Sequence, residues 1–533
     1  MLNEYQKSRR TFIKTAGLTL SAGVFPSVTG LGSIVATLDS TAISELSQLK
    51  HGIQFGDVLS DRAIVWSRAE RPARMLVEYS FYPDFKDSTV IQGPLALEDT
   101  DYTARFDLTG LPSGQDVFVR VMFQDLDNNQ AVSKAGSGHF RTAPDQAKNI
   151  RFLWSGDTCG QGWGINPDIG GMRIYETMRL TDPDFFIHCG DNIYADCPIQ
   201  ESQIVHETGE VWRNIVIPEV TKVAETLDEF RGRYKYNLLD HNLRRFNAEV
   251  PTIWLWDDHE VTNNWSPSKD LEGDARYSEK NIADLVSLGT IAALEYAPIR
   301  YHQANENQRI YRKLPYGPLL DLFVMDMRSY RGANNYNRQE QPGADSDYLG
   351  REQLNWLKAG LKNSTAIWKV IAADMPIGLQ LGDGFDQQNR PQFENFANGD
   401  GPVLGREFEI AELLAFVKQE KIVNMVWFTA DVHYCAAHYY EPDKAEFKNF
   451  EPFWEFVSGP LNAGSFGPHQ LDNTFGPQLI FQKASPSPNL SPLSGLQFFG
   501  QVDIESESLA MTVSLKDIDG GILFTQEIKP SII

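Results

Sequence analysis

Four short segments of this sequence each place chemically reactive side chains directly after an apolar run. The segments are Ser155-Gly156-Asp157-Thr158-Cys159, Gly190-Asp191-Asn192-Ile193-Tyr194, Trp256-Asp257-Asp258-His259 and Thr429-Ala430-Asp431-Val432-His433. A single segment of this kind often only caps a turn. Four of them bring carboxylate, imidazole, thiol and phenol groups to the predicted ends of strands, and such groups bind metal ions. We therefore expect a metal centre.

The second segment shows the pattern most clearly. Residues 185–189, Phe-Phe-Ile-His-Cys, form an apolar run, which is typical of a parallel strand that is buried on both faces. The run ends in Gly190-Asp191, so Asp191 is predicted to lie at the carboxyl end of the strand. Open α/β sheets form their ligand sites at this edge.

The predicted elements around these segments alternate between strands and helices. Strands are predicted at residues 151–155, 184–188, 252–256, 320–325, 368–372 and 423–428, helices at 223–246, 281–296 and 351–361, and a hairpin at 509–515 and 521–527. This alternation indicates a layered α/β domain, which we assign to residues 146–533. Two polar segments, 381–402 and 485–495, are predicted to be long loops that shape access to the site.

Residues 46–145 have a different pattern. Short alternating runs at 63–67, 75–80, 103–108 and 117–123 are separated by turns such as Leu111-Pro112-Ser113-Gly114. About seven short strands without helical periodicity predict a small all-β sandwich of the immunoglobulin or fibronectin type. The region holds no cluster of reactive side chains, so we expect it to serve in packing or surface recognition.

Composition restricts the function classes. The net charge of −23 argues against general binding to nucleic acid or to an anionic membrane, because contact with phosphates requires clustered Lys and Arg. If the substrate is a phosphate ester, bound cations must attract it. The chain has 4 cysteines, too few for a disulfide framework, although Cys189 and Cys197 could pair.

The amino terminus has the form of a twin-arginine export signal. Ser8-Arg9-Arg10-Thr11-Phe12-Ile13-Lys14 precedes a modestly apolar stretch, and we assign residues 1–45 to this signal and a linker. The pattern predicts export through the twin-arginine machinery to the periplasm or the cell exterior. Beyond this stretch, no run of about 18 apolar residues predicts a membrane span.

Taken together, the four segments resemble the calcineurin-like metallophosphoesterases. They are most similar to the PhoD-type alkaline phosphatases, a branch that uses a Cys, Gly-Asp-x-x-Tyr, Asp-Asp-His-Glu and Asp-Val-His. The segment Asp326-Met327-Arg328-Ser329-Tyr330-Arg331 also looks like that branch. The resemblance covers nearly all of the chain after the signal. It implies a metallophosphoesterase α/β sandwich and hydrolysis of phosphate esters.

The resemblance also implies roles for individual residues at two metal sites. The first site, implied to hold Fe³⁺, would take Asp191 as a bridging ligand together with Asp157, Cys159, Tyr194 and His433. Thiolate and phenolate donors suit a trivalent ion. The second site would take Asp191, Asp258 and Asp431, an oxygen set that favours one or more Ca²⁺ ions over zinc.

The implied mechanism is an attack on phosphorus by a hydroxide held between the metal ions. His259 would protonate the leaving oxygen; alternatively, it packs against Trp256 and is satisfied by Glu260. Arg328 would hold a phosphate oxygen through its planar guanidinium; alternatively, it forms a salt bridge with Asp326.

Two other functions stay open at this point. The same chemistry serves a phosphodiesterase, of phospholipase D-like activity, that cleaves lipid or teichoic-acid-like polymers. A surface binding protein with a structural metal site is the alternative from outside the enzymes. The set Asp191, Asp258, His259 and His433 argues against it, because a structural metal site would not need His259.

Overall fold

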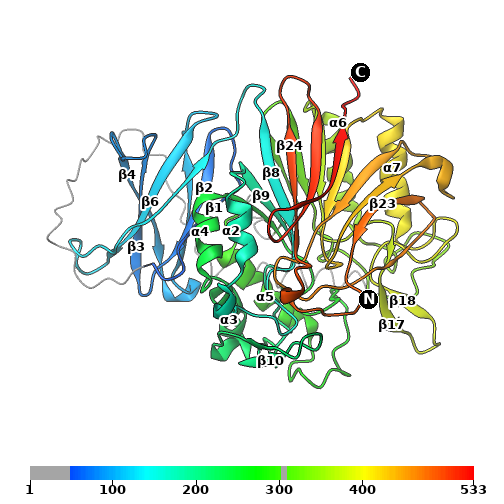
Figure 1. Ribbon diagram of the computed structural model, residues 1–533, viewed down its shortest axis with the longest axis horizontal. Helices are drawn as coiled ribbons and strands as arrows, with labels where there is room; N and C mark the ends of the chain where they lie inside the picture. Colours follow the sequence, from blue (N-terminus) through cyan, green and yellow to red (C-terminus); the bar gives the residue numbers. More distant parts are fainter. Residues whose placement is uncertain (1–48, 302–308, 533) are drawn as a thin grey trace. The chain divides into compact units, whose positions relative to one another are not determined.

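The computed structural model describes residues 49–301 and 309–532. The helices and strands of these residues lie in one compact unit formed by Ala42–Arg300 and Ile310–Ile533 (Figure 1). The predicted export signal, residues 1–45, lies outside the described residues. In the described part of the chain, we find no helix with the length and apolar character needed to cross a membrane.

The larger of two central sheets contains the first three strands predicted for the α/β domain. Its nine strands follow the order β26-β25-β24-β8-β9-β12-β1-β2-β5. Strands β8, β9 and β12 run parallel, and the carboxyl-terminal hairpin forms β25 and β26 as predicted. The bounds are β1 Ile53–Gly56, β2 Arg62–Arg68, β5 Thr103–Thr109, β8 Ile150–Ser155, β9 Phe185–Cys189, β12 Thr252–Leu255, β24 Phe498–Ile504, β25 Met511–Asp517 and β26 Ile522–Ile528.

The second central sheet contains the other three predicted strands. Its seven strands follow the order β13-β14-β15-β19-β21-β20-β23, and β14, β15, β19 and β21 run parallel. The bounds are β13 Arg312–Tyr316, β14 Leu320–Val324, β15 Trp368–Ala372, β19 Met425–Thr429, β20 Cys435–Tyr440, β21 Phe453–Val457 and β23 Pro477–Lys483.

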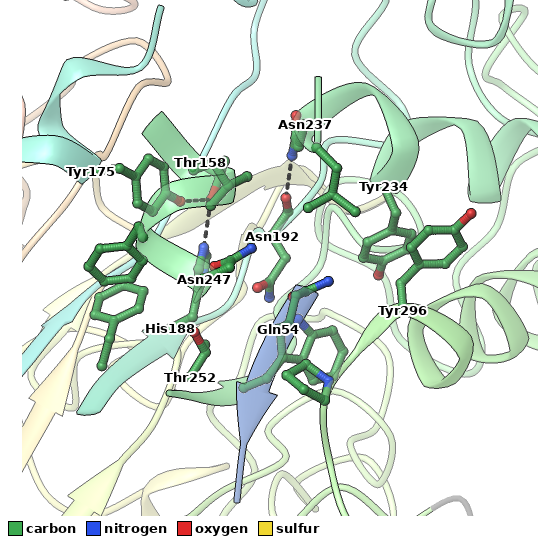
Figure 2. Close-up of a pocket in the computed structure, with 16 residues that line it drawn as sticks. Gln54, Thr158, Tyr175, His188, Asn192, Tyr234, Asn237, Asn247, Thr252 and Tyr296 are labelled. Atoms are coloured by element: carbon green, nitrogen blue, oxygen red, sulfur yellow. Dashed lines mark hydrogen bonds between the residues drawn. The ribbon is translucent and has the colours of Figure 1, made fainter. Parts of the chain in front are cut away.

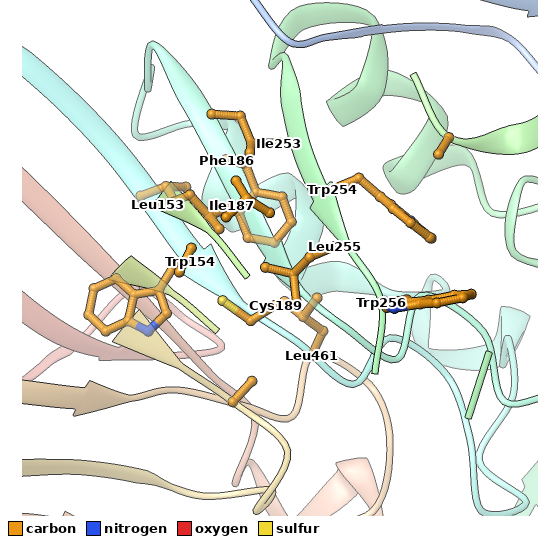
Figure 3. Packing of buried hydrophobic residues seen from close by; sticks show 14 of the residues in the cluster. Leu153, Trp154, Phe186, Ile187, Cys189, Ile253, Trp254, Leu255, Trp256 and Leu461 are labelled. Carbon is orange, nitrogen blue, oxygen red and sulfur yellow. The ribbon is translucent and has the colours of Figure 1, made fainter. Parts of the chain in front are cut away.

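The two sheets pack face to face across an apolar core. The ring of Trp154 in β8 lies 4.5 Å from that of Phe428 in β19, measured between centroids. Figure 3 shows Trp154, Ile187, Cys189 and Leu255 packed together from neighbouring strands of the larger sheet. The apolar runs of β8, β9 and β12 are explained by this packing, because helices cover the opposite face.

Helices cover the outer faces of both sheets. Phe246 of α4 packs on Phe186 of β9, with ring centroids 5.4 Å apart, and Leu354 and Leu357 of α6 share a core cluster with Ile371 of β15. The result is a four-layer α/β/β/α arrangement. The helix bounds are α2 Arg173–Arg179, α3 Leu227–Asn237, α4 His241–Glu249, α5 Ile282–Tyr296, α6 Arg351–Asn363 and α7 Glu407–Gln419.

The single helical stretch predicted for residues 223–246 is divided in the structure. It forms α3 and α4, and the side chain of Asp240 caps α4 by accepting the N–H groups of Asn242 and Leu243. An Asp at this position favours the start of a new helix over continuation of the old one. The prediction of one helix was therefore wrong at this point.

The amino-terminal strands form a β-sandwich that shares a sheet with the α/β part. Four strands in the order β4-β3-β6-β7 enclose an apolar core with β1, β2 and β5. In turn, β1 pairs in parallel with β12 through Gly56 and Thr252. The region therefore has two sheets, as predicted, and one of them continues into the larger central sheet. The bounds are β3 Ala73–Ser80, β4 Thr89–Ala96, β6 Asp116–Asp125 and β7 Gly136–Arg141.

Short elements occupy the connecting segments. The predicted loop at 381–402 contains a small hairpin of β17 and β18. The short strands are β10 Ser202–Ile204, β11 Val211–Arg213, β16 Leu379–Gln380, β17 Gly382–Phe385, β18 Pro391–Phe393 and β22 Gln470–Leu471, and the 3₁₀ helices are Glu98–Thr100, Pro167–Ile169, Pro218–Val220, Pro442–Lys444 and Pro492–Ser494.

A buried ion pair joins the β1–β2 connection to β13. The side chains of Asp57 and Arg312 are 0% and 2% exposed, and Arg312 Nη2 lies 2.7 Å from Asp57 Oδ1. Asp57 also accepts the backbone N–H of Arg300 at 2.7 Å. Breaking a buried pair leaves an uncompensated charge, which is strongly destabilising.

We predict that Asp57→Asn lowers the free energy of unfolding by about 3 kcal/mol. Asn tolerates the positive φ of 43° at this position, so the loss would come from the charge. Urea unfolding measures the effect. The control is Asp61→Asn, which removes an exposed partner of Arg62 and should change stability by less than about 0.5 kcal/mol. Equal stability of Asp57→Asn and wild type would contradict the prediction.

Candidate metal centre

The chemical segments follow the carboxyl ends of strands, as predicted. Asp157 follows β8, Asp191 follows β9, Asp258 follows β12, and Asp431 and His433 follow β19. Four of these five residues have left-handed backbone conformations, with φ of 62° at Asp157, 53° at Asp191, 65° at Asp431 and 58° at His433. Residues other than Gly seldom adopt this region, and such conformations concentrate at functional sites.

The structure brings most of the predicted ligands into overlapping groups. The donor atoms of Asp157, Asp191 and His433 lie within 4.8 Å of one another, as do those of Asp191, Asp258 and His259. A third group is formed by Asp257, Asp258 and Asp431. The carboxylates of Asp191 and Asp258 each belong to two groups, which is the arrangement a bridging ligand requires.

The donor set fits multivalent cations. Both carboxylate oxygens of Asp157 are buried without a hydrogen-bond partner among the described residues, and unpaired buried charge is costly. Burial, together with the nearby carboxylate of Asp258, raises the pKa of Asp157 and of Asp191 well above the ordinary value. A bound cation reverses such shifts by favouring the ionised carboxylates.

His433 is oriented to offer one nitrogen to this site. Its Nδ1 lies 2.5 Å from the carbonyl oxygen of Gly464, so Nδ1 carries the proton and donates it. Nε2 is then an acceptor, and it lies at hydrogen-bond distance, 3.0 Å, from the hydroxyl of Tyr194. Burial lowers the pKa of His433 to about 3. A neutral imidazole fixed through its other nitrogen is the usual form of a histidine ligand.

Cys159 lies in the predicted loop but outside the donor groups of the described residues. Its thiol donates to the carbonyl oxygen of Trp163 at 3.3 Å, and burial raises its pKa. The neighbouring Gly160 lets the loop approach Tyr194, since a Cβ at Gly160 would lie 2.2 Å from the Tyr194 ring. All four cysteines, which belong to the described residues, are free, so Cys189 and Cys197 do not pair.

The guanidinium of Arg328 contacts carboxylates on several loops. It is fully buried, forms close ion pairs with Asp257 and Glu394, and lies 3.2 Å from Asp374 and 3.7 Å from Asp431. The alternative of a guanidinium salt bridge with Asp326 is wrong, because Asp326 instead accepts the backbone N–H of Arg328. The guanidinium of Arg328 therefore holds acidic side chains at one side of the metal centre.

Glu394 belongs to the functional residues that sequence reasoning missed. It lies just after β18 in the segment predicted to be a loop, and it is 5% exposed. The sequence offers one signal for it, a carboxylate in Phe393-Glu394-Asn395-Phe396, where the flanking aromatics predict burial. A buried Glu requires a partner, and that partner is Arg328.

His259 is held by Asp196, a second residue that the sequence reasoning missed. His259 Nδ1 lies 2.5 Å from Asp196 Oδ1, and Nε2 lies 3.8 Å from Asp258 Oδ1. The imidazole stacks on Tyr194 with ring centroids 4.3 Å apart. Burial alone would lower the pKa of His259, but Asp196, Asp258 and Asp191 outweigh it and raise the pKa well above its ordinary value. The expected alternative, in which Glu260 satisfies His259, was wrong.

Glu260 instead organises the backbone of two ligand loops. Its carboxylate accepts the N–H groups of Asp257 at 2.8 Å, Asn192 at 2.6 Å and Asp191 at 3.3 Å. One buried side chain thereby fixes the loop after β9 relative to the loop after β12. Such supporting contacts orient ligands without touching the metal.

A cavity of about 60 Å³ has Thr158 and Asn192 among its lining residues. Figure 2 shows Thr158 bonded to His188 and Tyr175, and the side chain of Asn237 bonded to Asn192. Thr158 and Asn192 each neighbour a predicted ligand. The rest of the lining is largely apolar and includes Phe186, Phe246 and Trp254.

Two family models match the chain. The model described as PhoD-like phosphatase matches residues 152–515, and the one described as PhoD-like phosphatase, N-terminal domain, matches residues 36–144. Alkaline phosphatase D of Bacillus subtilis (strain 168) is 25% identical over 493 residues, which span 87% of this chain and 78% of that protein.

Two solved structures share the fold. A structure of PhoD has a TM-score of 0.67 at 19% identity and covers 92% of this chain and 94% of its own. A purple acid phosphatase from yellow lupin (Lupinus luteus) seeds has a TM-score of 0.53 at 13% identity, covering 90% of this chain and 74% of its own. The predicted layered α/β architecture is thereby confirmed.

We predict that Glu260→Gln lowers metal affinity and kcat/KM by about 10- to 100-fold. The amide keeps the shape but replaces an accepting oxygen by an NH₂ group, which would face a backbone N–H. Metal content after dialysis and the rate of phosphate ester hydrolysis measure the effect. Glu272→Gln, on an exposed loop, is the control and should match wild type. Full metal content and activity in Glu260→Gln would refute this role.

Proposed function

We propose that the overlapping donor groups around Asp191 are the reaction centre of this chain. The chain belongs to the PhoD-like phosphatase family, which makes it a metal-dependent phosphoric ester hydrolase. The observation that carries the proposal is the sharing of the Asp191 carboxylate by two groups. Because the family consists of phosphatases, the alternative of a surface binding protein with a purely structural metal is set aside.

We assign the donors around Asp191 to two different cations on the basis of their chemistry. Asp157, Asp191, Tyr194 and His433 would hold ferric iron, and Cys159 would join them by exchanging its bond to Trp163 for the metal. Phenolate and thiolate donors favour a trivalent ion. Asp258 shares one group with Asp191 and another with Asp431, and these three carboxylates would supply an oxygen set that suits calcium. Cations bound there would supply a nucleophile at neutral pH and neutralise charge on the phosphoryl oxygens.

In our proposal, the protein's own contribution to the reaction is a positioned proton donor. Asp196 holds Nδ1–H of His259, and the stacked ring of Tyr194 restrains the imidazole plane. Nε2 of His259 would deliver a proton to the leaving oxygen. Arg328 would act as a positioning residue, since its contacts are to carboxylates and its side chain is fully buried. Direct binding of a phosphate oxygen by Arg328 would require those contacts to rearrange.

The proposal also covers the organisation of the chain. Residues 1–45 would direct export by the twin-arginine machinery to the periplasm or the cell exterior, which suits a protein that folds around its metal before transport. Residues 46–145 would form an immunoglobulin- or fibronectin-like domain ahead of the catalytic domain at 146–533. Because β1 pairs with β12, this region would also stabilise the larger central sheet of the catalytic domain.

We predict that chelation lowers hydrolysis of p-nitrophenyl phosphate and bis-p-nitrophenyl phosphate by about 100-fold or more. Iron together with calcium should restore the rate. The ratio of the two rates distinguishes a phosphomonoesterase from a diesterase on lipid or polymer substrates. Unchanged turnover by protein that metal analysis shows to be free of metal would contradict the proposal.

We predict that His259→Gln slows hydrolysis of an alkyl phosphate by about 10²- to 10⁴-fold and slows p-nitrophenyl phosphate much less. An alkoxide needs a proton in order to leave, whereas p-nitrophenolate is a stable anion. The comparison of kcat for glycerol phosphate and p-nitrophenyl phosphate measures the effect. An equal loss with both esters would mean that His259 only supports the structure.

A further inference from the structure

A second kind of metal-binding group lies beside the carboxylate centre. The donor atoms of Asp196, Cys197 and His259 lie within 4.8 Å of one another. Asp196 Oδ1 is 2.5 Å from His259 Nδ1 and 3.6 Å from Cys197 Sγ. The group shares His259 with one of the donor groups around Asp191. It uses Nδ1, however, whereas Nε2 is the nitrogen that faces Asp258.

The donor chemistry of this group differs from that of the carboxylate centre. One thiol, one imidazole and one carboxylate form a set that suits zinc and other thiophilic cations. In a tetrahedral zinc site, bonds of about 2.0 to 2.3 Å place neighbouring ligand atoms roughly 3.5 Å apart. The sulfur to oxygen separation of 3.6 Å meets this requirement, and the nitrogen to oxygen contact must lengthen by about 1 Å.

The loop that carries the group is anchored and partly open. The backbone N–H of Asn263 donates to Asp196 Oδ2 at 3.1 Å, and Arg276 Nη1 donates to the carbonyl oxygen of Asp196 at 3.1 Å. Asp196 and His259 are buried, whereas Cys197 is partly exposed. Three protein ligands would leave the fourth position of a tetrahedral site for water.

We propose that Asp196, Cys197 and His259 form a separate site for a thiophilic divalent cation, Zn²⁺ or Cd²⁺, and that occupancy of this site inhibits the enzyme. The cation replaces the thiol proton of Cys197 and the Nδ1 proton of His259, and both protons go to solvent. The imidazole is then bound through Nδ1 and pulled from the position in which Asp196 holds it. Inhibition rests on the proposed role of His259, whereas cation binding does not.

The test is a titration of the metal-loaded enzyme with Cd²⁺, followed by the ultraviolet cadmium-thiolate charge-transfer band and by hydrolysis of p-nitrophenyl phosphate and glycerol phosphate. We expect the band to saturate at one Cd²⁺ per chain while glycerol phosphate hydrolysis falls. In Cys197→Ser, the band should vanish, and half-inhibition should require about tenfold or more Cd²⁺. The control is Cys435→Ser, whose thiol faces the carbonyl oxygen of Lys483 at 3.8 Å.

The possible outcomes separate this inference from the proposed function. A band that survives Cys197→Ser but is lost in Cys159→Ser would assign the cation to the iron site and overturn the inference. Equal inhibition of wild type and Cys197→Ser would do the same. A band that depends on Cys197 in a protein with no turnover of any ester would support the binding site and contradict the proposed function instead.

Discussion

Electrostatic repulsion among buried carboxylates is the constraint on which the rest of this structure depends. Asp157, Asp191, Asp257 and Asp258 are each at most 3% exposed and meet at one edge of the fold, with Asp431 beside them. Water cannot screen their charges there, and burial raises the pKa of Asp157, Asp191 and Asp257 well above the ordinary value, so these carboxylates would remain neutral or repel their neighbours. Multivalent cations remove the conflict, because they convert the repulsion into coordination.

Several buried contacts keep these carboxylates close together. Arg328 places one buried positive charge among Asp257, Asp374 and Glu394. Glu260 ties the loops after β9 and β12 through backbone N–H groups. Four left-handed residues in the ligand loops persist because these contacts outweigh their backbone strain. These contacts hold the carboxylates in place before a cation or a substrate binds.

The scaffold explains why the ligands come from distant parts of the sequence. Parallel strands β8, β9 and β12 end at the same edge of one sheet, and β19 ends at the facing edge of the other. The tightly packed rings of Trp154 and Phe428 set the distance between these two sheets. The apolar core therefore fixes the position of Asp431 and His433 relative to Asp157 and Asp191.

Sequence reasoning located the strands and the ligands at their ends, because these features depend on a local pattern of residues. The buried runs before Asp157, Asp191 and Asp431 are readable as strands, and strand ends are where ligands collect. The partners Asp196 and Glu394 were missed because they reach His259 and Arg328 across 63 and 66 residues of sequence, and no periodicity reports such contacts. The thiol of Cys159 turns toward Trp163 on a loop whose side-chain directions follow no regular repeat. The division of residues 223–246 into two helices was readable from the cap at Asp240.

The central claim, that Asp191 bridges two cations, is tested most directly by the metal stoichiometry of Asp191→Asn beside that of Asp157→Asn. A bridging carboxylate contributes to both sites, whereas Asp157 belongs to one donor group. The account predicts that Asp191→Asn loses both cations under dialysis that leaves wild type loaded, and that Asp157→Asn retains calcium. An Asp191→Asn protein that keeps the wild-type complement of metal, with its fold intact, would contradict the account.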